Sequence, residues 1–271
     1  MFNVSPAARP LAPEPAGAPQ TGPSGWPTPG RILYGLYAWL QFVLIGLITL
    51  MLLALPGTLA RRRALVGAAA RLTLRLAGMR VQISGATQLP QPCIVVANHC
   101  SYLDGVLLAG ALPPSFSFVI KREMSAVPLA GPLLRRIGVE FMERRDHGKV
   151  LRDTRRVLRQ AAGGQALVFF PEGTFSHEVG LLHFHIGAFT AAARAHLPLV
   201  PLAIRGTRHC LPPGSPWPQP GRIEVQVLPA VPALPAARGI RNFAAAAALR
   251  EQTRAALLQA LGEPDLGAAA R

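Results

Sequence analysis

A histidine and an aspartate follow a short apolar stretch of the sequence. Ile94–Ala97 is apolar, Asn98-His99 ends it, and Asp104 stands at the start of a second apolar run. This pattern predicts a buried strand that leads into a helix, with His99 at the junction and Asp104 in the first turn of the helix. Such junctions in open α/β sheets often carry functional sites. A histidine close to an aspartate suggests a general base and the group that orients it.

The same two residues also have a purely structural interpretation. Ser101 and Asp104 form a capping-box pattern, so Asp104 could simply accept hydrogen bonds from the first amides of the helix. His99 could be a hydrogen-bonded side chain at the end of a strand. The adjacent Cys100 is not expected to act as a nucleophile with His99, because neighbouring residues of an extended segment point in different directions. The pair therefore needs support from other parts of the chain.

Three other apolar stretches also end in polar or charged residues. They are followed by Lys121, by Arg144 and by the run Glu172-Gly173-Thr174. An arginine can hold a phosphate group with two hydrogen bonds, and a lysine attracts it as a point charge. Together with a histidine–aspartate pair, these residues suggest a site for an anionic lipid headgroup. The alternatives are solvated surface cations for Lys121 and Arg144, and an ordinary turn for the Pro-Glu-Gly segment.

The composition limits the possible partners. The chain has 271 residues, half of them apolar, and a net charge of +15. Such a charge fits nucleic acid or an anionic membrane surface. The arginines are spread along the chain and only 3 Tyr and 3 Trp accompany them, so we expect no nucleic-acid partner. The three cysteines, Cys93, Cys100 and Cys210, have no metal-ligand spacing, which indicates a reducing compartment and no metal site.

The N-terminal part of the chain contains a candidate membrane helix. Residues 1–30 are rich in Pro, Ala and Gly, and we expect them to form a disordered tail. Ile32–Leu55 has no charged residue, and its 24 residues would form a helix of about 36 Å, enough to cross the hydrocarbon core. The arginines that follow it place the C-terminal side in the cytoplasm by the positive-inside rule. The alternative is an interfacial hairpin that does not cross.

The next segment is basic and amphipathic. Arg61–Met79 has leucine and alanine residues on one helical face and arginines on the others. This pattern predicts a helix at the level of the lipid headgroups, or an ordinary surface helix packed on the domain. We therefore expect residues 31–79 to anchor the protein at the inner cell membrane, with a catalytic domain that faces the cytoplasm.

From residue 80 onward, short strands alternate with helices, which predicts an α/β domain. We expect a mostly parallel central sheet of about seven strands flanked by helices over residues 80–262, followed by a frayed C-terminus over 263–271. The expected strands are Arg80–Ser84, Cys93–Ala97, Phe116–Ile120, Val139–Met142, Ala166–Phe170, Leu199–Ile204 and Arg222–Leu228. The expected helices are Asp104–Ala111, Val127–Ile137, His147–Ala162, Ala188–Ala195 and Asn242–Leu261.

These residues together resemble the glycerolipid acyltransferase family, and specifically the 1-acyl-glycerol-3-phosphate acyltransferases. Four motifs of the family occur in the family's order and spacing over roughly residues 80 to 210. The first is matched by Asn98-His99 and Asp104, the second by Gly138, Phe141 and Arg144, the third by Phe170-Pro171-Glu172-Gly173-Thr174, and the fourth by Val200-Pro201-Leu202-Ala203-Ile204. This conjunction of motifs is highly specific.

The resemblance implies a membrane-bound enzyme that moves a fatty acyl group from a thioester to a lysolipid. The donor would be acyl-CoA or acyl carrier protein, and no cofactor or metal is implied. The acceptor would be 1-acyl-glycerol-3-phosphate, giving phosphatidic acid, or another lysolipid such as a lyso-ornithine lipid or a lysophospholipid. His99 would be the base and Asp104 would orient it. The resemblance assigns the acceptor site to the remaining residues, Lys121, Arg144, Glu172, Gly173 and Thr174.

The chain departs from the family pattern at two positions near the expected headgroup site. Many members have an arginine where this chain has Phe175, and a lysine where it has His185. Both changes remove a permanent positive charge. They bear on the identity of the acceptor more than on the reaction.

Overall fold

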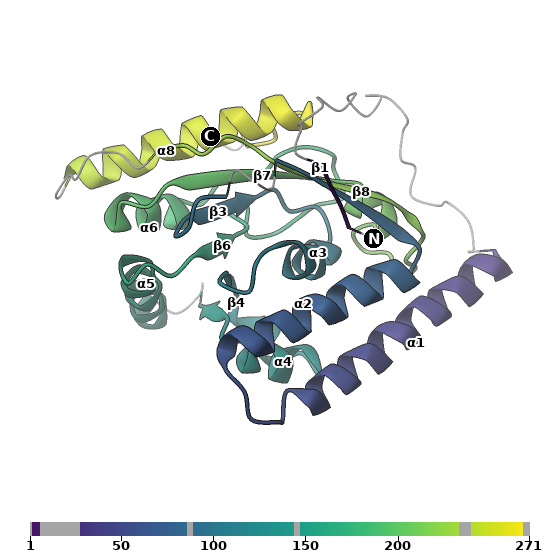
Figure 1. Cartoon of the computed structure of the whole chain (residues 1–271). Helices are drawn as coiled ribbons and strands as arrows, with labels where there is room; N and C mark the ends of the chain where they lie inside the picture. Colours follow the sequence, from purple (N-terminus) through teal and green to yellow (C-terminus); the bar gives the residue numbers. More distant parts are fainter. Residues whose placement is uncertain (1, 6–27, 86–88, 144–146, 233–239, 268–271) are drawn as a thin grey trace.

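A single sheet of eight strands organises the protein (Figure 1), in the order β1-β2-β8-β7-β3-β6-β4-β5. The structure, a computed structural model, describes residues 2–5, 28–85, 89–143, 147–232 and 240–267. The strands are β1 (Asn3–Ser5), β2 (Met79–Ser84), β3 (Ile94–Ala97), β4 (Ser117–Lys121), β5 (Glu140–Met142), β6 (Leu167–Phe169), β7 (Leu199–Arg205) and β8 (Gly221–Val227). Every neighbouring pair is parallel except β7–β8, which confirms the expected α/β class.

The central strands are buried on both faces. All four residues of β3 and all three of β6 are buried, which explains why both are continuous apolar runs rather than alternating ones. In β2, near the edge of the sheet, buried and exposed residues alternate. The seven expected strands are all present, each shifted by at most a residue or two.

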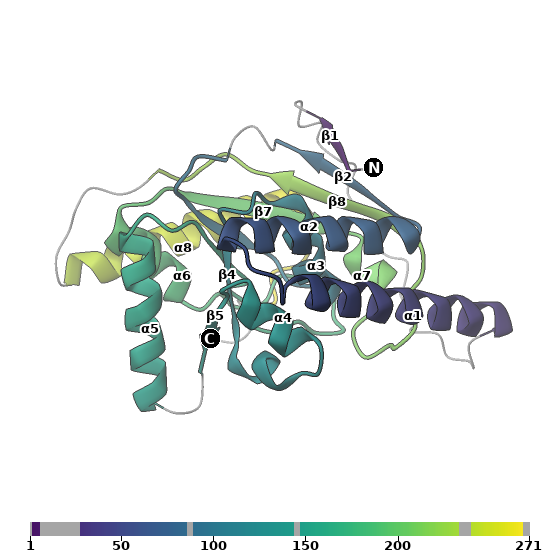
Figure 2. The ribbon, with the colours of Figure 1, turned by 60° about the horizontal axis from the view of Figure 1, so that its bottom comes forward.

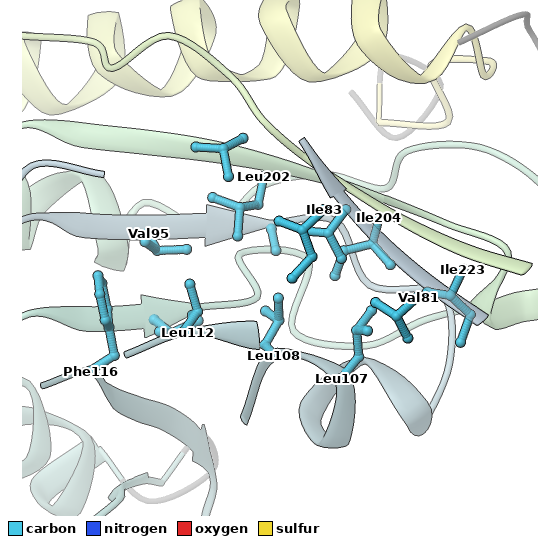
Figure 3. Close-up of a cluster of buried hydrophobic side chains, with 14 of the residues drawn as sticks. Val81, Ile83, Val95, Leu107, Leu108, Leu112, Phe116, Leu202, Ile204 and Ile223 are labelled. Carbon is cyan, nitrogen blue, oxygen red and sulfur yellow. The ribbon is translucent and has the colours of Figure 1, made fainter. Parts of the chain in front are cut away.

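Helices cover both faces of the sheet (Figures 1 and 2). On one face, α2 (Leu59–Leu76) and α3 (Leu103–Ala111) pack on the first hydrophobic core. Figure 3 shows Leu107 and Leu108 of α3 within this core, together with Val95 and Ile204 of the sheet. On the other face, α5 (His147–Ala162), α6 (Gly187–Ala195) and α8 (Ile240–Leu261) pack on a second core. Three shorter helices are η2 (Arg122–Ala126), α4 (Ala130–Arg136) and α7 (Thr207–Cys210).

The long apolar helix α1 (Pro29–Leu52) lies along α2 (Figures 1 and 2). It is the one described helix that is long and apolar enough to cross a membrane. Tyr34 Oη donates a hydrogen bond to the carbonyl of Ala77 (2.6 Å), and Trp39 Nε1 donates one to the carbonyl of Pro216 (2.6 Å). The opposite face of α1 exposes large apolar side chains, including Leu36, Leu40, Val43, Leu47 and Ile48.

Both ends of the chain differ from expectation where they are described. Asn3–Ser5, within the segment expected to be disordered, forms β1 and pairs with β2. Backbone hydrogen bonds hold this three-residue strand, so it needs no apolar pattern in its sequence. Residues 29 and 30, also expected in the tail, begin α1, and residues 1 and 6–27 lie outside the described residues. Residues 263–267 are not frayed, because the backbone of Leu181 pairs with Pro264 and Gly267.

Candidate active site

The expected site residues lie at one edge of the sheet. Strands β3, β4, β5 and β6 run parallel to one another, so their carboxyl ends share an edge. Val96 of β3 and Phe169 of β6 are in register. His99 and Glu172 each follow three residues later in these neighbouring strands. The parallel topology therefore brings two segments together that are 73 residues apart in the chain.

His99 and Asp104 form the expected pair. His99 Nδ1 lies 2.7 Å from Asp104 Oδ2, and Asp104 is completely buried. The same oxygen accepts hydrogen bonds from the backbone N–H groups of Cys100 (2.7 Å) and Ser101 (2.9 Å). Asp104 therefore holds the histidine ring and the turn before α3, but it does not cap the helix, because the two amides it binds precede Leu103. The amides stabilise its negative charge.

The arrangement fixes which nitrogen of His99 faces outward. With Asp104 ionised as the acceptor, Nδ1 carries the hydrogen and Nε2 keeps its lone pair. The His99 side chain is 19% exposed, whereas Asp104 is at 0%, so the ring meets solvent and its partner does not. A neutral imidazole held in this way can accept a proton from a hydroxyl group that approaches Nε2.

Asn98 fixes the strand end from which His99 projects. Its Nδ2 donates to the carbonyl of Ile204 (3.0 Å), and its Oδ1 accepts from the N–H of Ile204 (2.7 Å). Both ends of this buried amide therefore bind the backbone of β7. The sequence places Asn98 in a motif but indicates no role for it, because its partner is 106 residues away.

Aromatic rings surround the His99 ring. Phe170 stacks on it with ring centroids 4.4 Å apart and an interplanar angle of 23°. Phe175 meets it edge-on at 4.7 Å, and Tyr102 meets Phe175 edge-on at 4.8 Å. These contacts restrict the ring and remove water from its sides. The sequence analysis missed this role of both phenylalanines, although Phe175 was noted as a departure from the family pattern.

Glu172 holds the backbone of the site rather than facing outward. The residue is 4% exposed. Its Oε1 accepts from the N–H of His99 (2.7 Å) and its Oε2 from the N–H of Leu182 (2.8 Å). Burial raises the pKa of Glu172 to about 8, against the two backbone hydrogen bonds, which lower it. Glu172 therefore connects the end of β6 to His99 and to the Leu182 loop.

The next residues close the turn that carries Glu172. The N–H of Gly173 donates to the carbonyl of Phe170 (3.0 Å), and Gly173 has φ of +68°, which a glycine adopts without strain. Thr174 follows and is exposed. Glycine at this position is therefore required by the turn, while Thr174 is accessible from outside.

The expected cations are only partly described. Lys121 is the last residue of β4 and lies at the same edge as His99. Strand β6 separates β4 from β3, so Lys121 starts about 10 Å from the histidine strand, two strand spacings away. Arg144 falls outside the described residues, two positions after the end of β5. The headgroup-binding expectation is untested at Arg144.

Cys100 lies in the core beneath the site. Burial raises its pKa well above the ordinary thiol value, so the thiolate is disfavoured. Its Sγ lies 3.3 Å from Asn98 Nδ2 and 3.9 Å from Thr207 Oγ1. In the part of the chain that the structure describes, no group of three His, Cys, Asp or Glu side chains could hold a metal ion.

Comparison with known proteins points to one family. A family model described as Acyltransferase matches residues 80–205, a range that contains all four motifs. The computed structure resembles the crystal structure of the 1-acyl-sn-glycerophosphate acyltransferase PlsC from Thermotoga maritima, with a TM-score of 0.69 over 86% of this chain and 96% of that one. At 22% identity this likeness concerns the fold.

Curated relatives agree with this assignment. The chain is 34% identical over 139 residues to a chloroplastic 1-acyl-sn-glycerol-3-phosphate acyltransferase of Brassica napus, covering 50% of this chain and 40% of that protein. It is 33% identical over 160 residues to the human alpha form, covering 58% and 56%. The chain thus spans about half the length of the curated relatives it matches. With the motifs and the fold, these matches support an assignment to the glycerolipid acyltransferase family.

Proposed function

We propose that this protein transfers a fatty acyl group from a thioester to the free hydroxyl of 1-acyl-glycerol-3-phosphate, giving phosphatidic acid for phospholipid synthesis. The observation that carries the proposal is the His99–Asp104 pair, joined at 2.7 Å through Nδ1, with the His99 side chain 19% exposed. Relatives from Brassica napus, human and yeast carry the name 1-acyl-sn-glycerol-3-phosphate acyltransferase, which supports the same reaction.

The proposed mechanism is a direct transfer. His99 Nε2 removes the proton of the lipid hydroxyl as its oxygen attacks the thioester carbonyl carbon. The new C–O bond forms, the C–S bond breaks, and the thiol leaves with the proton that His99 carried. Asp104 stabilises the imidazolium that exists between these two proton transfers. No acyl-enzyme forms on Cys100, since it is buried and its Sγ contacts Asn98 and Thr207.

The remaining residues would position the acceptor. Lys121 and Arg144 are proposed to bind the acceptor phosphate, and Gly173 and Thr174 to form the wall of the acceptor site. Glu172 shapes this site indirectly, because both of its oxygens already accept backbone hydrogen bonds. If Arg144 grips the phosphate in the ground state and the transition state alike, Arg144→Ala raises the acceptor KM with little change in kcat. Steady-state kinetics with varied acceptor test this, and an unchanged acceptor KM contradicts it.

A second acceptor class is supported by two positions. Phe175 packs against His99 where many family members have an arginine, and His185 is exposed where many have a lysine. Both residues lower the positive charge available to a phosphate. A lyso-ornithine lipid or another lysophospholipid is therefore the alternative acceptor, used through the same mechanism.

We further propose that the protein works at the inner cell membrane with its catalytic domain on the cytoplasmic side. The exposed apolar face of α1 supports membrane contact. The helix contacts the globular domain near both ends, through Tyr34 and through Leu53, whose carbonyl accepts from Arg136 (2.8 Å). A helix that crossed the bilayer would carry one of these ends to the far side. We therefore favour α1 lying in one leaflet, the second arrangement that the sequence left open.

An assay of the purified protein against a panel of lysolipids tests the function directly. Lysophosphatidic acid, a lyso-ornithine lipid and lysophosphatidylcholine are each supplied with acyl-CoA and with acyl-ACP. Selective acylation of lysophosphatidic acid supports the main proposal, and preference for another lysolipid supports the alternative. The donor that gives the higher kcat/KM identifies the acyl carrier. A lack of acyl transfer to every acceptor contradicts both.

A further inference from the structure

Arg254, far from His99 and Asp104 in the sequence, is a buried arginine that is linked to His99 by hydrogen bonds. Arg254 of α8 is 8% exposed. Its Nη1 donates to the carbonyl of Leu182, and its Nη2 donates to the carbonyl of Leu181 (2.9 Å) and to Asp265 Oδ1. Its guanidinium also lies over the ring of Phe184, 5.0 Å from the centroid. These partners offset the cost of burying the Arg254 charge, and their geometry fixes the direction of its guanidinium.

The peptide group between Leu181 and Leu182 lies between Arg254 and the active site. Its carbonyl oxygen accepts from Arg254 Nη2, and its N–H donates to Glu172 Oε2 (2.8 Å). The other oxygen of Glu172 accepts from the backbone N–H of His99 (2.7 Å). A continuous chain of hydrogen bonds thus runs from α8 through one peptide group and one carboxylate to the catalytic histidine.

A cation at one end of a peptide group strengthens the donor at its other end. The guanidinium polarises the carbonyl of Leu181, which makes the N–H of Leu182 a better donor to Glu172. An ionised carboxylate is an acceptor only, so it suits two N–H donors; a protonated one would place an O–H against one of them. The chain of hydrogen bonds therefore favours the ionised form of Glu172.

We propose that Arg254 is a positioning residue for acyl transfer, which acts through the Leu181–Leu182 peptide to favour the carboxylate form of Glu172 against burial and so fixes the backbone of His99. Its effect on turnover rests on the function proposed above. Its effect on Glu172 does not, and can be measured without substrate.

The other charged groups around Glu172 oppose this effect. Asp104 at the start of α3 and Glu263 after α8 are both negative and raise its pKa, as burial does. The ring of His99 faces the same region, from the residue whose N–H binds Glu172. Arg254 is the cation that acts on Glu172 through the Leu182 amide. Without Arg254, the effects of burial and of the two anions on Glu172 are opposed less strongly, so the pKa of Glu172 rises further.

The variant Arg254→Met tests the proposal, because methionine keeps an apolar side chain over Phe184 but loses the charge and the donors. Arg250→Met is the matched control. Arg250 lies one turn earlier in α8, and both arginines line a cavity of about 140 Å³. The guanidinium of Arg250, however, pairs with Glu251 (2.9 Å). The titration of the Glu172 carboxyl is followed by ¹³C NMR in labelled protein, with Glu172→Gln used to assign the signal. The pH dependence of kcat is measured in parallel.

We expect the Glu172 midpoint to rise by about one pH unit in Arg254→Met, which is about a tenfold lower ionised fraction and a similar fall in kcat near pH 7. The kcat profile should move to higher pH by the same amount, with the acceptor KM nearly unchanged. Arg250→Met should match the wild type. An unchanged Glu172 midpoint overturns the proposal, even if the melting temperature falls, because that result describes a purely structural arginine.

Two further measurements keep the test decisive. If Arg254→Met does not fold, Arg254→Gln retains a neutral donor and should show the same upward shift of the Glu172 midpoint; a wild-type midpoint overturns the proposal. Asp265→Asn loosens the C-terminal segment while Arg254 keeps its charge, so its midpoint should stay near that of the wild type. If the wild type transfers no acyl group, the proposed function fails, and the NMR titration still decides the role of Arg254.

Discussion

Two segments that follow neighbouring strands hold their carboxylates in different ways. After β3, Asp104 accepts from His99, Cys100 and Ser101, all within five residues of it. After β6, Glu172 accepts from His99, 73 residues away, and from Leu182. The peptide group of Leu182 is held by Arg254, which lies 73 residues after Leu181. The acid–base pair is thus a local device, and the structure that holds it in place is a tertiary one.

The comparison suggests a division of labour. The local segment supplies the pair to which we assign the chemistry, and it needs only a strand end and a helix start. The second segment supplies no exposed reactive atom on Glu172, but it determines where the backbone of His99 lies. Changes in both segments should therefore reduce stability, and changes in the first should reduce turnover more strongly than changes in the second.

The largest effect is expected from the base itself. His99→Ala removes the group that takes the proton of the lipid hydroxyl, and we expect kcat to fall about 10³- to 10⁴-fold. The ring is partly exposed, so the variant should keep the wild-type circular dichroism spectrum and lose little stability. Single-turnover acyl transfer measures the effect. Full activity in a folded His99→Ala protein would remove the proposed mechanism.

The next effect concerns the partner of the base. Asp104→Asn keeps the size of the side chain but loses the charge that fixes the His99 tautomer and stabilises the imidazolium. We expect kcat to fall about 10²- to 10³-fold with an unchanged acceptor KM. The variant should also be about 1–3 kcal/mol less stable, because the amides of Cys100 and Ser101 lose part of their acceptor. Chemical denaturation measures the stability change, and a variant with near-normal turnover contradicts the role of Asp104.

Glu172→Gln should have a smaller effect on turnover and a comparable effect on stability. The glutamine oxygen can accept from one of the two amides, of His99 and Leu182, while its NH₂ group faces the other. We expect kcat to fall about 10- to 100-fold and the stability to fall by about 1–3 kcal/mol. The comparison with Asp104→Asn is the informative one. If Glu172→Gln reduced turnover more than Asp104→Asn without loss of stability, Glu172 would contact substrate directly.

A further effect, which needs no substrate, is a pH dependence of stability. Burial raises the folded-state pKa of Glu172 from 4.5 to about 8. Below pH 4.5 both states are protonated; between 4.5 and 8 the folded state holds a proton that the unfolded state releases. The contribution of Glu172 to stability is therefore lost as the pH rises toward 8 and is constant above it. Between pH 5 and pH 9, the free energy of unfolding should fall less steeply for Glu172→Gln than for the wild type. Parallel pH dependences would contradict the raised pKa.

Much of the fold could be predicted because its signals are local. The buried runs of β3 and β6 are continuous apolar stretches, and each is bounded by polar turn residues. The helices after them follow from periodicity and from capping residues such as Ser101, whose Oγ accepts from Leu103 N–H (3.2 Å). The short strand β1 could not be predicted, because three residues paired to β2 through their backbone carry no apolar pattern.

The sequence by itself determined the catalytic pair, since His99 and Asp104 are placed by one strand end and one helix start within six residues. It also determined the α/β class, through the alternation of apolar strands and helices. The tertiary structure alone decided what holds the pair: the Asn98–Ile204 bonds, the stacking of Phe170, and the link from Glu172 through Leu182 to Arg254. These partners are far apart in the chain, and only the parallel order of β6, β3 and β7 brings their polar groups within hydrogen-bonding distance.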